Sequence, residues 1–240
     1  MSPIAAPAPF PKAILFDAYG TLFDVHAVVA AAEQLFPGRG EALSQLWRRK
    51  QIEYTQLRTL SAPDGARYRP FWDITLDALR YAARTLGVAL GASAEKRLMD
   101  EYACLSTYPD TVPVLRRLRA LPGAPRLAIL SNGDTRMLDI AVKSAGMAGL
   151  FDRVLSVETV RAYKPAAAAY RLGTAAFDAE PHELAFVSSN GWDAAGAGWF
   201  GYTTFWLNRG GAPGEELGIA PAATGAGMDD LLAFVSGLAA

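Results

Sequence analysis

The sequence predicts an α/β protein in which a doubly wound parallel sheet carries an inserted all-helical domain. The apolar run at residues 13–16 does not alternate with polar residues, which is typical of a strand buried on both faces. From residue 108 onward, similar runs alternate with helix-like segments, as in repeated strand-helix-strand units. Residues 24–107 contain no such run. We therefore expect a core made of residues 12–23 and 108–240, interrupted by a helical domain over residues 24–107.

The predicted helical domain begins directly after the first strand. Its helices are expected over residues 24–36, 41–60, 73–86 and 94–105, with breaks at 37–40 and 61–65, where Pro and Gly occur. In the second helix, Arg48, Gln51 and Ile52 share one face, which offers a guanidinium beside apolar surface to the strand ends. The alternative is that residues 48–50 form a solvated basic turn, as charge runs usually do.

The predicted core resumes at residue 108 and alternates helices with buried strands. Its helices are expected over residues 111–120, 136–145, 166–177, 194–200 and 228–238, and its strands over 126–130, 153–157, 183–187 and 203–207. Gly146 suits the C-terminal cap of the second of these helices, because glycine readily adopts the left-handed conformation found there. The Gly- and Ala-rich residues 210–227 are expected to form a surface connection.

The composition excludes several kinds of partner. Among the 240 residues, 23 Lys and Arg nearly balance 24 Asp and Glu, so no overall charge attracts nucleic acid or a lipid surface. Cys104 is the single cysteine, which excludes an internal disulfide and a thiolate metal cluster, and we expect it to be buried. Residues 1–11 lack the features of a signal peptide, and no run is long and apolar enough to cross a membrane. We therefore predict a cytoplasmic protein.

Polar side chains follow three of the predicted strands. Asp17 follows the first strand and Gly20 then supplies a turn, so Asp17 is expected at the carboxyl edge of the sheet, where open α/β sheets bind ligands. The other residues expected at this edge are Ser131, Asn132, Lys164, Ser188, Asn190 and Asp193. A carboxylate nucleophile, a lysine and a second carboxylate are what a covalent aspartyl-ester mechanism requires.

Each of these residues also has a purely structural interpretation. The structural alternative is a turn, a helix cap or a strand-end cap for Asp17, Ser131, Ser188 and Asp193. Lys164 can equally be a surface lysine. Phe71 and Trp192, two further candidates, can belong to the core, as aromatic residues usually do.

Four motifs carry a resemblance to a known family. They are Asp17-x-Tyr19-Gly20-Thr21-Leu22, Leu130-Ser131-Asn132-Gly133, Tyr163-Lys164-Pro165 and Val187-Ser188-Ser189-Asn190-x-Trp192-Asp193. Together they resemble the motifs of the haloacid dehalogenase-like superfamily, specifically of its L-2-haloacid dehalogenases. The segments Trp47-Arg48-x-Lys50-Gln51 and Tyr68-x-x-Phe71-Trp72 resemble the helical cap of that family. The resemblance covers residues 12–208 and implies a Rossmann-like core with an inserted helical cap.

The resemblance implies hydrolysis of (S)-2-haloacids to (R)-2-hydroxyacids and halide, with inversion at C2. Asp17 is expected to attack C2 and form an ester that water then hydrolyses, while Arg48 accepts the departing halide. The implied catalytic residues are Asp17, Thr21, Arg48, Lys164, Ser188, Asn190 and Asp193. Of these, Thr21, Lys164 and Ser188 are expected to orient Asp17. The implied substrate contacts are Ala18, Tyr19, Arg48, Ile52, Phe71, Ser131, Asn132, Tyr170 and Trp192.

The residue at position 19 separates two activities of this superfamily. Its phosphatases carry a second aspartate two residues after the nucleophile, which protonates an alkoxide leaving group, whereas this chain has Tyr19. The last motif offers one carboxylate, Asp193, although a hard divalent cation prefers several. A halide needs no proton to leave, so we predict a dehalogenase with no metal and no cofactor. A magnesium-dependent phosphatase and a non-catalytic interaction protein are the alternatives.

The expected partners are a small 2-haloalkanoic acid, water and halide, and the resemblance also implies a homodimer. The cap departs from the family pattern in two places. The loop at residues 61–69 is longer than usual, and Gln56 stands where an aromatic residue is common. These departures concern the substrate entrance and the pairing of cap helices in a dimer, and they leave the expectation for Asp17 unchanged.

Overall fold

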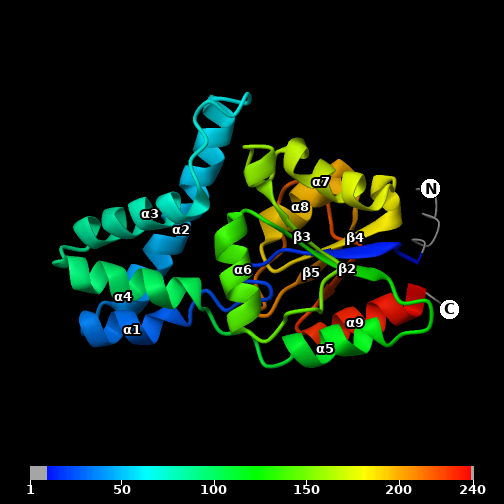
Figure 1. Cartoon of the computed structure of the whole chain (residues 1–240), viewed down its shortest axis with the longest axis horizontal. Coiled ribbons are helices and arrows are strands. Elements are labelled where there is room, and N and C mark those ends of the chain that lie inside the picture. Colours follow the sequence, from blue (N-terminus) through cyan, green and yellow to red (C-terminus); the bar gives the residue numbers. More distant parts are fainter. Residues whose placement is uncertain (1–9, 239–240) are drawn as a thin grey trace.

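A computed structural model describes residues 10–238 of the protein (Figure 1). The α-helices are α1 (Val28–Leu35), α2 (Gly40–Ser61), α3 (Phe71–Thr85), α4 (Ala92–Ala103), α5 (Thr111–Arg119), α6 (Thr135–Ser144), α7 (Ala167–Phe177), α8 (Gly191–Phe200) and α9 (Met228–Leu238). The strands are β1 (Ala13–Phe16), β2 (Arg126–Ser131), β3 (Arg153–Ser156), β4 (Leu184–Ser188), β5 (Thr203–Leu207) and β6 (Ala223–Gly225). Short 3-10 helices occupy Val157–Thr159 and Pro181–Glu183.

The sheet has β1 near its middle. Its order is β3-β2-β1-β4-β5-β6, and all neighbouring strands are parallel. Phe16 of β1 is level with Ile129 of β2 and with Val187 of β4. Because the strands run in one direction, their carboxyl ends meet at one edge of the sheet. The predicted doubly wound parallel sheet is therefore confirmed.

Helices cover both faces of this sheet, with α7 and α8 on one face and α5, α6 and α9 on the other (Figure 1). The side chains of Ile14 and Phe16 belong to the larger apolar cluster, which includes residues of α5, α6 and α9. Leu15 points to the opposite face and packs in the cluster that contains Tyr170 of α7 and Ala197 of α8. Burial on both faces explains why β1 is an unbroken apolar run.

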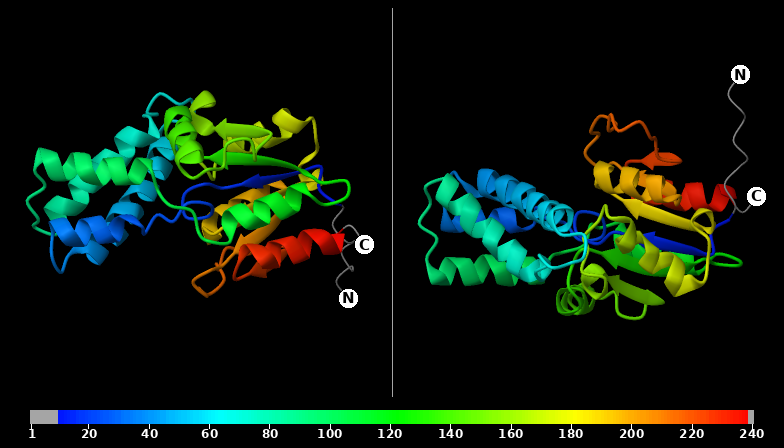
Figure 2. Two further views of the ribbon diagram at one scale, coloured as in Figure 1. Left: turned by 60° about the horizontal axis from the view of Figure 1, so that its bottom comes forward. Right: turned by 90° about the horizontal axis from the view of Figure 1, so that it is seen from above.

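Helices α1–α4 stand beyond the carboxyl ends of the strands and form a cap (Figure 1). All four lie within residues 24–107, the range predicted for the insertion. The longest, α2, packs against α3, and the indole nitrogen of Trp47 donates a hydrogen bond to the backbone oxygen of Thr75 at 2.7 Å. Both ends of the described chain lie on the side of the core remote from this cap (Figure 2).

Three local predictions were wrong. Helix α8 begins at Gly191 instead of residue 194, so Asp193 lies in its first turn and does not cap it. The short strand β6 lies inside the predicted connection 210–227, because residues 223–225 pair with β5. Cys104 is exposed, since it directly follows the last residue of α4 at the edge of the cap.

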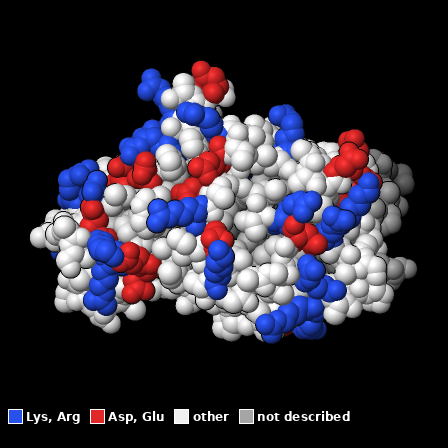
Figure 3. Space-filling view, viewed as in Figure 1, with Lys and Arg blue, Asp and Glu red and all other residues white. Residues whose placement is uncertain are grey.

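Charged side chains of both signs are scattered over the face shown in Figure 3, as the balanced composition predicts. Within residues 10–238, no helix combines the length and the apolar character that a membrane span requires. The expected absence of a signal peptide concerns residues 1–11, most of which lie outside the described residues.

Candidate active site

Asp17 lies where β1 ends and is 4% exposed. Its backbone N–H still donates to Val187 of β4 at 2.9 Å, so the carboxylate is held at the edge of the sheet. Gly20 then turns the chain at a φ of +96°, a value that favours glycine. The turn brings the Thr21 hydroxyl back to Asp17, where it donates to Oδ2 at 3.0 Å. The turn at Gly20 therefore brings the Thr21 hydroxyl into contact with the Asp17 carboxylate.

Lys164 joins Asp17 to Asp193. Its Nζ donates to Asp17 Oδ1 at 2.8 Å, to Asp193 Oδ2 at 2.6 Å and to the backbone oxygen of Leu130 at 3.2 Å. The Lys164 and Asp193 side chains are 1% and 0% exposed. Burial by itself lowers the pKa of Lys164, but the two carboxylates outweigh it and raise that pKa above its usual value. The ammonium therefore stays charged between two carboxylates, and the surface-lysine interpretation is wrong.

Asp193 accepts hydrogen bonds from two further side chains. The Tyr170 hydroxyl donates to Oδ1 at 2.7 Å, and the Ser188 hydroxyl donates to Oδ2 at 3.1 Å. Burial raises the pKa of Asp193 above its usual value, while the ammonium of Lys164 opposes this effect. Tyr170 was predicted to contact substrate, but in this structure it is fully buried behind Asp193.

Asn190 connects the core to the cap. Its Nδ2 donates to Asp17 Oδ2 at 3.0 Å, so Asp17 accepts from three donors in all. Its Oδ1 accepts from Arg48 Nη2 at 3.4 Å. Arg48 also donates to the backbone oxygen of Tyr19 at 2.8 Å through Nη2 and to Gln51 Oε1 at 2.7 Å through Nη1. Arg48 therefore faces the carboxyl edge of the sheet. The alternative, in which Arg48 belongs to a solvated basic turn, is wrong for this residue.

A small enclosed pocket of about 10 Å³ lies between these groups. It is lined by Asp17, Tyr19, Arg48, Ile52, Thr55, Phe71, Ser131, Asn132, Asn190 and Trp192. All of these except Thr55 were predicted from the sequence. Thr21, Lys164, Ser188 and Asp193 lie behind the lining and hold it through hydrogen bonds, while Ala18 does not line the pocket.

The residues at the end of β2 have structural partners as well. The Ser131 hydroxyl accepts from the backbone N–H of Gly133 at 3.0 Å, so Ser131 does cap its own turn. Asn132 Oδ1 accepts from the backbone N–H of Lys164 at 2.9 Å, which ties the end of β2 to the lysine loop. Asn132 lines the pocket, and its amide nitrogen is a hydrogen-bond donor.

Close packing of α8 completes the arrangement. A Cβ atom on Gly196 would lie 2.7 Å from Pro165 Cβ and 2.7 Å from the Tyr170 hydroxyl, distances that real Cβ contacts do not reach. The absence of a side chain at position 196 therefore lets α8 approach the loop that carries Lys164 and the hydroxyl that binds Asp193.

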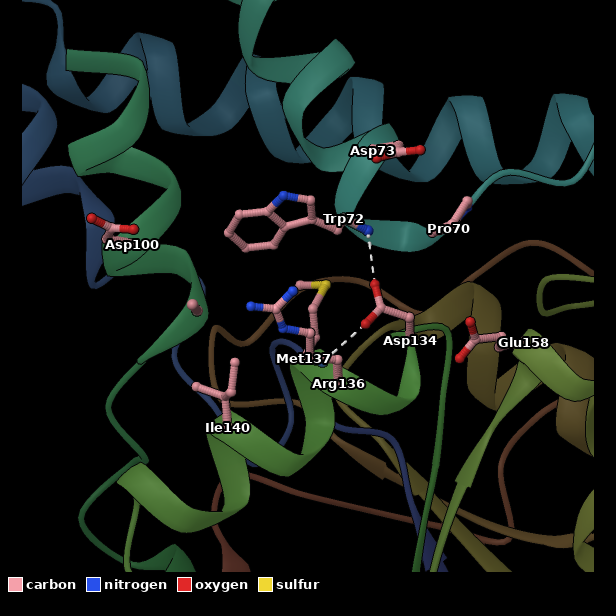
Figure 4. A pocket seen from close by; sticks show the side chains of 10 residues that line it. Pro70, Trp72, Asp73, Asp100, Asp134, Arg136, Met137, Ile140 and Glu158 are labelled. Carbon is pink, nitrogen blue, oxygen red and sulfur yellow. Dashed lines mark hydrogen bonds between the residues drawn. The ribbon is translucent and has the colours of Figure 1, made fainter. Parts of the chain in front are cut away.

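Further hydrogen bonds join the cap to the core, beyond those of Arg48. The backbone N–H of Trp72 donates to Asp134 Oδ2 at 3.1 Å, and Asp134 also caps α6 through the N–H of Met137 (Figure 4). Further along, the Tyr163 hydroxyl donates to the backbone oxygen of Arg69, and its N–H donates to Thr59 Oγ1 at 3.0 Å. The two contacts of Tyr163 hold the end of α2 and the loop after it against the segment that precedes Lys164.

The structure has two larger hollows, of which one shares residues with the site. The one in Figure 4, of about 430 Å³, lies between α3, α4 and α6 and holds none of the predicted catalytic residues. An open cleft of about 600 Å³ lies on the outer side of Arg48 and shares Arg48, Ile52 and Asn190 with the enclosed pocket. Among residues 10–238, no group of three or more His, Cys, Asp or Glu side chains is arranged to hold a metal ion.

The sequence reasoning missed four residues of the cap side. They are Gln51, Thr55 and Thr75, which are buried polar side chains, and the buried aromatic Tyr102. The sequence places Gln51 on the same helix face as Arg48 but indicates no role for it. A polar residue on the buried face of a predicted helix is the one signal that could have indicated Gln51, Thr55 and Thr75.

Comparison with known proteins agrees with the motifs. The model of the haloacid dehalogenase-like hydrolase family matches residues 11–201. The (S)-2-haloacid dehalogenase of Pseudomonas sp. (strain YL) is 45% identical over 210 residues, which cover 88% of this chain and 88% of that protein.

Two solved structures are similar over almost the whole chain. An L-2-haloacid dehalogenase with 61% identity superposes with a TM-score of 0.92 and covers 94% of this chain and 99% of its own. The L-2-haloacid dehalogenase from Xanthobacter autotrophicus with chloropropionic acid covalently bound has 37% identity and a TM-score of 0.84. The match covers 95% of this chain and 99% of that protein's chain. The predicted resemblance is confirmed, and this chain belongs to the haloacid dehalogenase-like hydrolase family, within its group of L-2-haloacid dehalogenases.

Proposed function

We propose that this protein hydrolyses (S)-2-haloacids to (R)-2-hydroxyacids and halide through an ester on Asp17. The observation that carries the proposal is the pairing of a triply hydrogen-bonded carboxylate with the Arg48 guanidinium in one enclosed pocket. The similarity to a dehalogenase with covalently bound chloropropionic acid supports an ester route.

In the first step, an oxygen of Asp17 attacks C2 of the substrate from the side opposite the halogen. A carbon-oxygen bond forms, the carbon-halogen bond breaks, and the electron pair leaves with the halide. Arg48 stabilises the negative charge that develops on the halogen, because its guanidinium is already oriented by Tyr19, Asn190 and Gln51. Inversion at C2 follows from attack on the face opposite the halogen.

In the second step, water attacks the carbonyl carbon of the Asp17 ester. Asn190 lines the pocket beside Asp17 and is placed to orient this water. Asp193 does not line the pocket, so it takes up the proton through Lys164, which passes one proton to Asp193 and accepts one from the attacking water. The raised pKa of Asp193 makes it a stronger base than an exposed aspartate. Lys164 donates to both carboxylates and stabilises the charge as it moves between them. The ester carbon-oxygen bond breaks, the proton held by Asp193 returns through Lys164 to the departing oxygen, and the hydroxyacid leaves.

Isotope labelling under single-turnover conditions tests this route. With enzyme in excess in oxygen-18 water, the hydroxyacid should contain unlabelled oxygen from Asp17, and the label should enter the Asp17 carboxylate. The released acid should have the (R) configuration. Label in the product during the first turnover would show direct attack of water on C2 and would contradict the ester route.

Two finer properties are also proposals. We propose that the protein forms a homodimer through its cap, because Leu57 and Leu60 near the end of α2 are 53% and 76% exposed. Light scattering should give a dimer for the wild type and a monomer for the Leu57→Lys, Leu60→Lys variant. Leu217→Lys is the matched control, since Leu217 is 41% exposed on the core. An unchanged mass of the double variant would contradict this interface.

We further propose that residues 24–107 are a separate cap domain and that the protein acts in the cytoplasm. The cap helices pack mainly on one another, and the single cysteine suits a reducing compartment. Fractionation of the native host with an antibody against the protein tests the location, and recovery in the extracytoplasmic fraction would contradict it.

A further inference from the structure

Gln51 is a fully buried polar residue behind Arg48, at the interface between α2 and α3. Its side chain is 0% exposed, and both of its polar atoms are used. Oε1 accepts from Arg48 Nη1 at 2.7 Å and from the Tyr102 hydroxyl at 3.1 Å, while Nε2 donates to Thr75 Oγ1 at 2.6 Å. A buried amide whose oxygen and nitrogen both have partners has one orientation that is strongly preferred.

The direction of these hydrogen bonds is set by Thr75. Its hydroxyl donates to the backbone oxygen of Phe71 at 2.8 Å, so its oxygen is left to accept from Gln51 Nε2. The Gln51 amide oxygen must then face Arg48. Without the Thr75 hydroxyl, the amide could flip and present its NH₂ group to a guanidinium that has only donors.

Tyr102 makes the second contact that holds this amide. It comes from α4, the last cap helix, and its ring stacks on Tyr19 at 5.6 Å with an interplanar angle of 15°. The ring also packs on Trp47, with 5.2 Å between the ring centroids, so it is held by two aromatic neighbours. Burial raises the pKa of Tyr102, although Arg48 opposes this effect, so the hydroxyl remains a neutral donor.

We propose that Thr75 and Tyr102 are positioning residues that hold the Arg48 guanidinium at the pocket by orienting the Gln51 amide. Neither residue lines the pocket, so they act through Arg48 without touching the substrate. The inference rests on the proposed function for the kinetic effect, because there Arg48 receives the departing halide. The orientation of Arg48 itself is independent of which reaction the site performs.

A matched pair at position 75 separates hydrogen bonding from packing. Thr75→Val keeps the shape and removes the hydroxyl, whereas Thr75→Ser keeps the hydroxyl and removes a methyl group. We expect kcat for (S)-2-chloropropionate to fall roughly three- to tenfold in Thr75→Val, the cost of one lost hydrogen bond, and less in Thr75→Ser. KM should change little, because the substrate carboxylate is bound elsewhere. A larger loss in Thr75→Ser than in Thr75→Val would indicate packing and overturn the proposal.

A second pair tests Tyr102. Tyr102→Phe removes only the hydroxyl, and Tyr81→Phe is the control, because Tyr81 is a cap tyrosine outside the pocket. We expect Tyr102→Phe to lower kcat more for (S)-2-chloropropionate than for the bromo acid, since chloride is the poorer leaving group and depends more on Arg48. Equal losses for both substrates, or the same loss in Tyr81→Phe, would contradict positioning of the halide acceptor.

Rotation of the Arg48 guanidinium gives a measurement that does not require turnover. Nitrogen-15 NMR of arginine side chains, assigned by loss of the signal in Arg48→Lys, should show hindered rotation in the wild type. Rotation should be faster in Thr75→Val and Tyr102→Phe and unchanged in Tyr81→Phe. Equal rotation rates in all variants would overturn the inference. If wild-type protein released no halide but rotation changed as expected, the proposed function would fail and the positioning network would stand.

Discussion

The two halves of the active site are held by different interactions: buried ion pairs on the core side and hydrogen bonds to neutral acceptors on the cap side. On the core side, the Lys164 ammonium contacts both the Asp17 and the Asp193 carboxylate, and all three side chains are almost completely buried. On the cap side, Arg48 is half-buried and is held by neutral acceptors, namely Gln51 Oε1, Asn190 Oδ1 and the backbone oxygen of Tyr19. The core side thus sets the charge and basicity of the reacting groups. The cap side sets the orientation of the group that receives the leaving charge.

The largest effect is expected at the nucleophile. Asp17→Ala should lower halide release roughly 10⁴-fold or more for every halogen, because no ester can form. Circular dichroism should show that the fold persists. This variant tests the core side directly, and substantial halide release by correctly folded Asp17→Ala protein would contradict the covalent mechanism.

Lys164→Met should have the next largest effect, and it should appear in stability as well as in rate. Two buried carboxylates then lose the cation between them, which typically costs about 3–5 kcal/mol of the free energy of unfolding. Urea unfolding at neutral pH measures this loss. A surface control is Lys143→Met, since the Lys143 side chain is 68% exposed. Equal destabilisation in the two variants would show that the buried cation has no special role.

Arg48→Lys should separate the cap side from the core side. We expect kcat for the chloro acid to fall roughly 10²–10³-fold, because lysine cannot satisfy the same three acceptors while facing the halide. The loss should be smaller for the bromo acid, and urea unfolding should change far less than in Lys164→Met. A loss that is independent of the halogen would place Arg48 outside the departure of the halide.

The smallest effect concerns pH and should belong to the core side alone. Asp193 acts as a base only when deprotonated, so activity should fall as the pH drops through its pKa. Burial raises this pKa above the usual 3.8, and the Tyr170 hydroxyl lowers it. Tyr170→Phe should therefore move the acid limb of kcat to higher pH by roughly 0.5–1 unit. Tyr102→Phe on the cap side should leave the acid limb of kcat at the same pH. A shift of the acid limb in this variant would contradict the assignment of pH dependence to the core side alone.

The core half of the site could be predicted because the sequence pattern shows where buried strands end. An apolar run followed by Asp17 and Gly20 places a carboxylate at a known edge of the sheet, and the family motifs supply Lys164 and Asp193. The sequence indicates that these residues meet. It does not indicate that Lys164 bridges both carboxylates or that Tyr170 binds Asp193, because those contacts depend on how α7 and α8 pack on the sheet.

The cap half was only partly predictable. Arg48 and Ile52 were found through helical spacing and resemblance, but Thr75 and Tyr102 lie 24 and 51 residues from Gln51, and no local pattern links them. Tyr102 resembles an ordinary core aromatic. Strand β6 was missed for a similar reason, since three residues in a Gly- and Ala-rich stretch become a strand only by pairing with β5.

The bare backbone at Gly196 has a consequence for engineering. Helix α8 approaches Pro165 and Tyr170 so closely that even a methyl group there would displace the loop of Lys164. Libraries intended to accept longer or bulkier acids should therefore leave Gly196 unchanged and vary Ile52 and Thr55 of α2, which line the pocket.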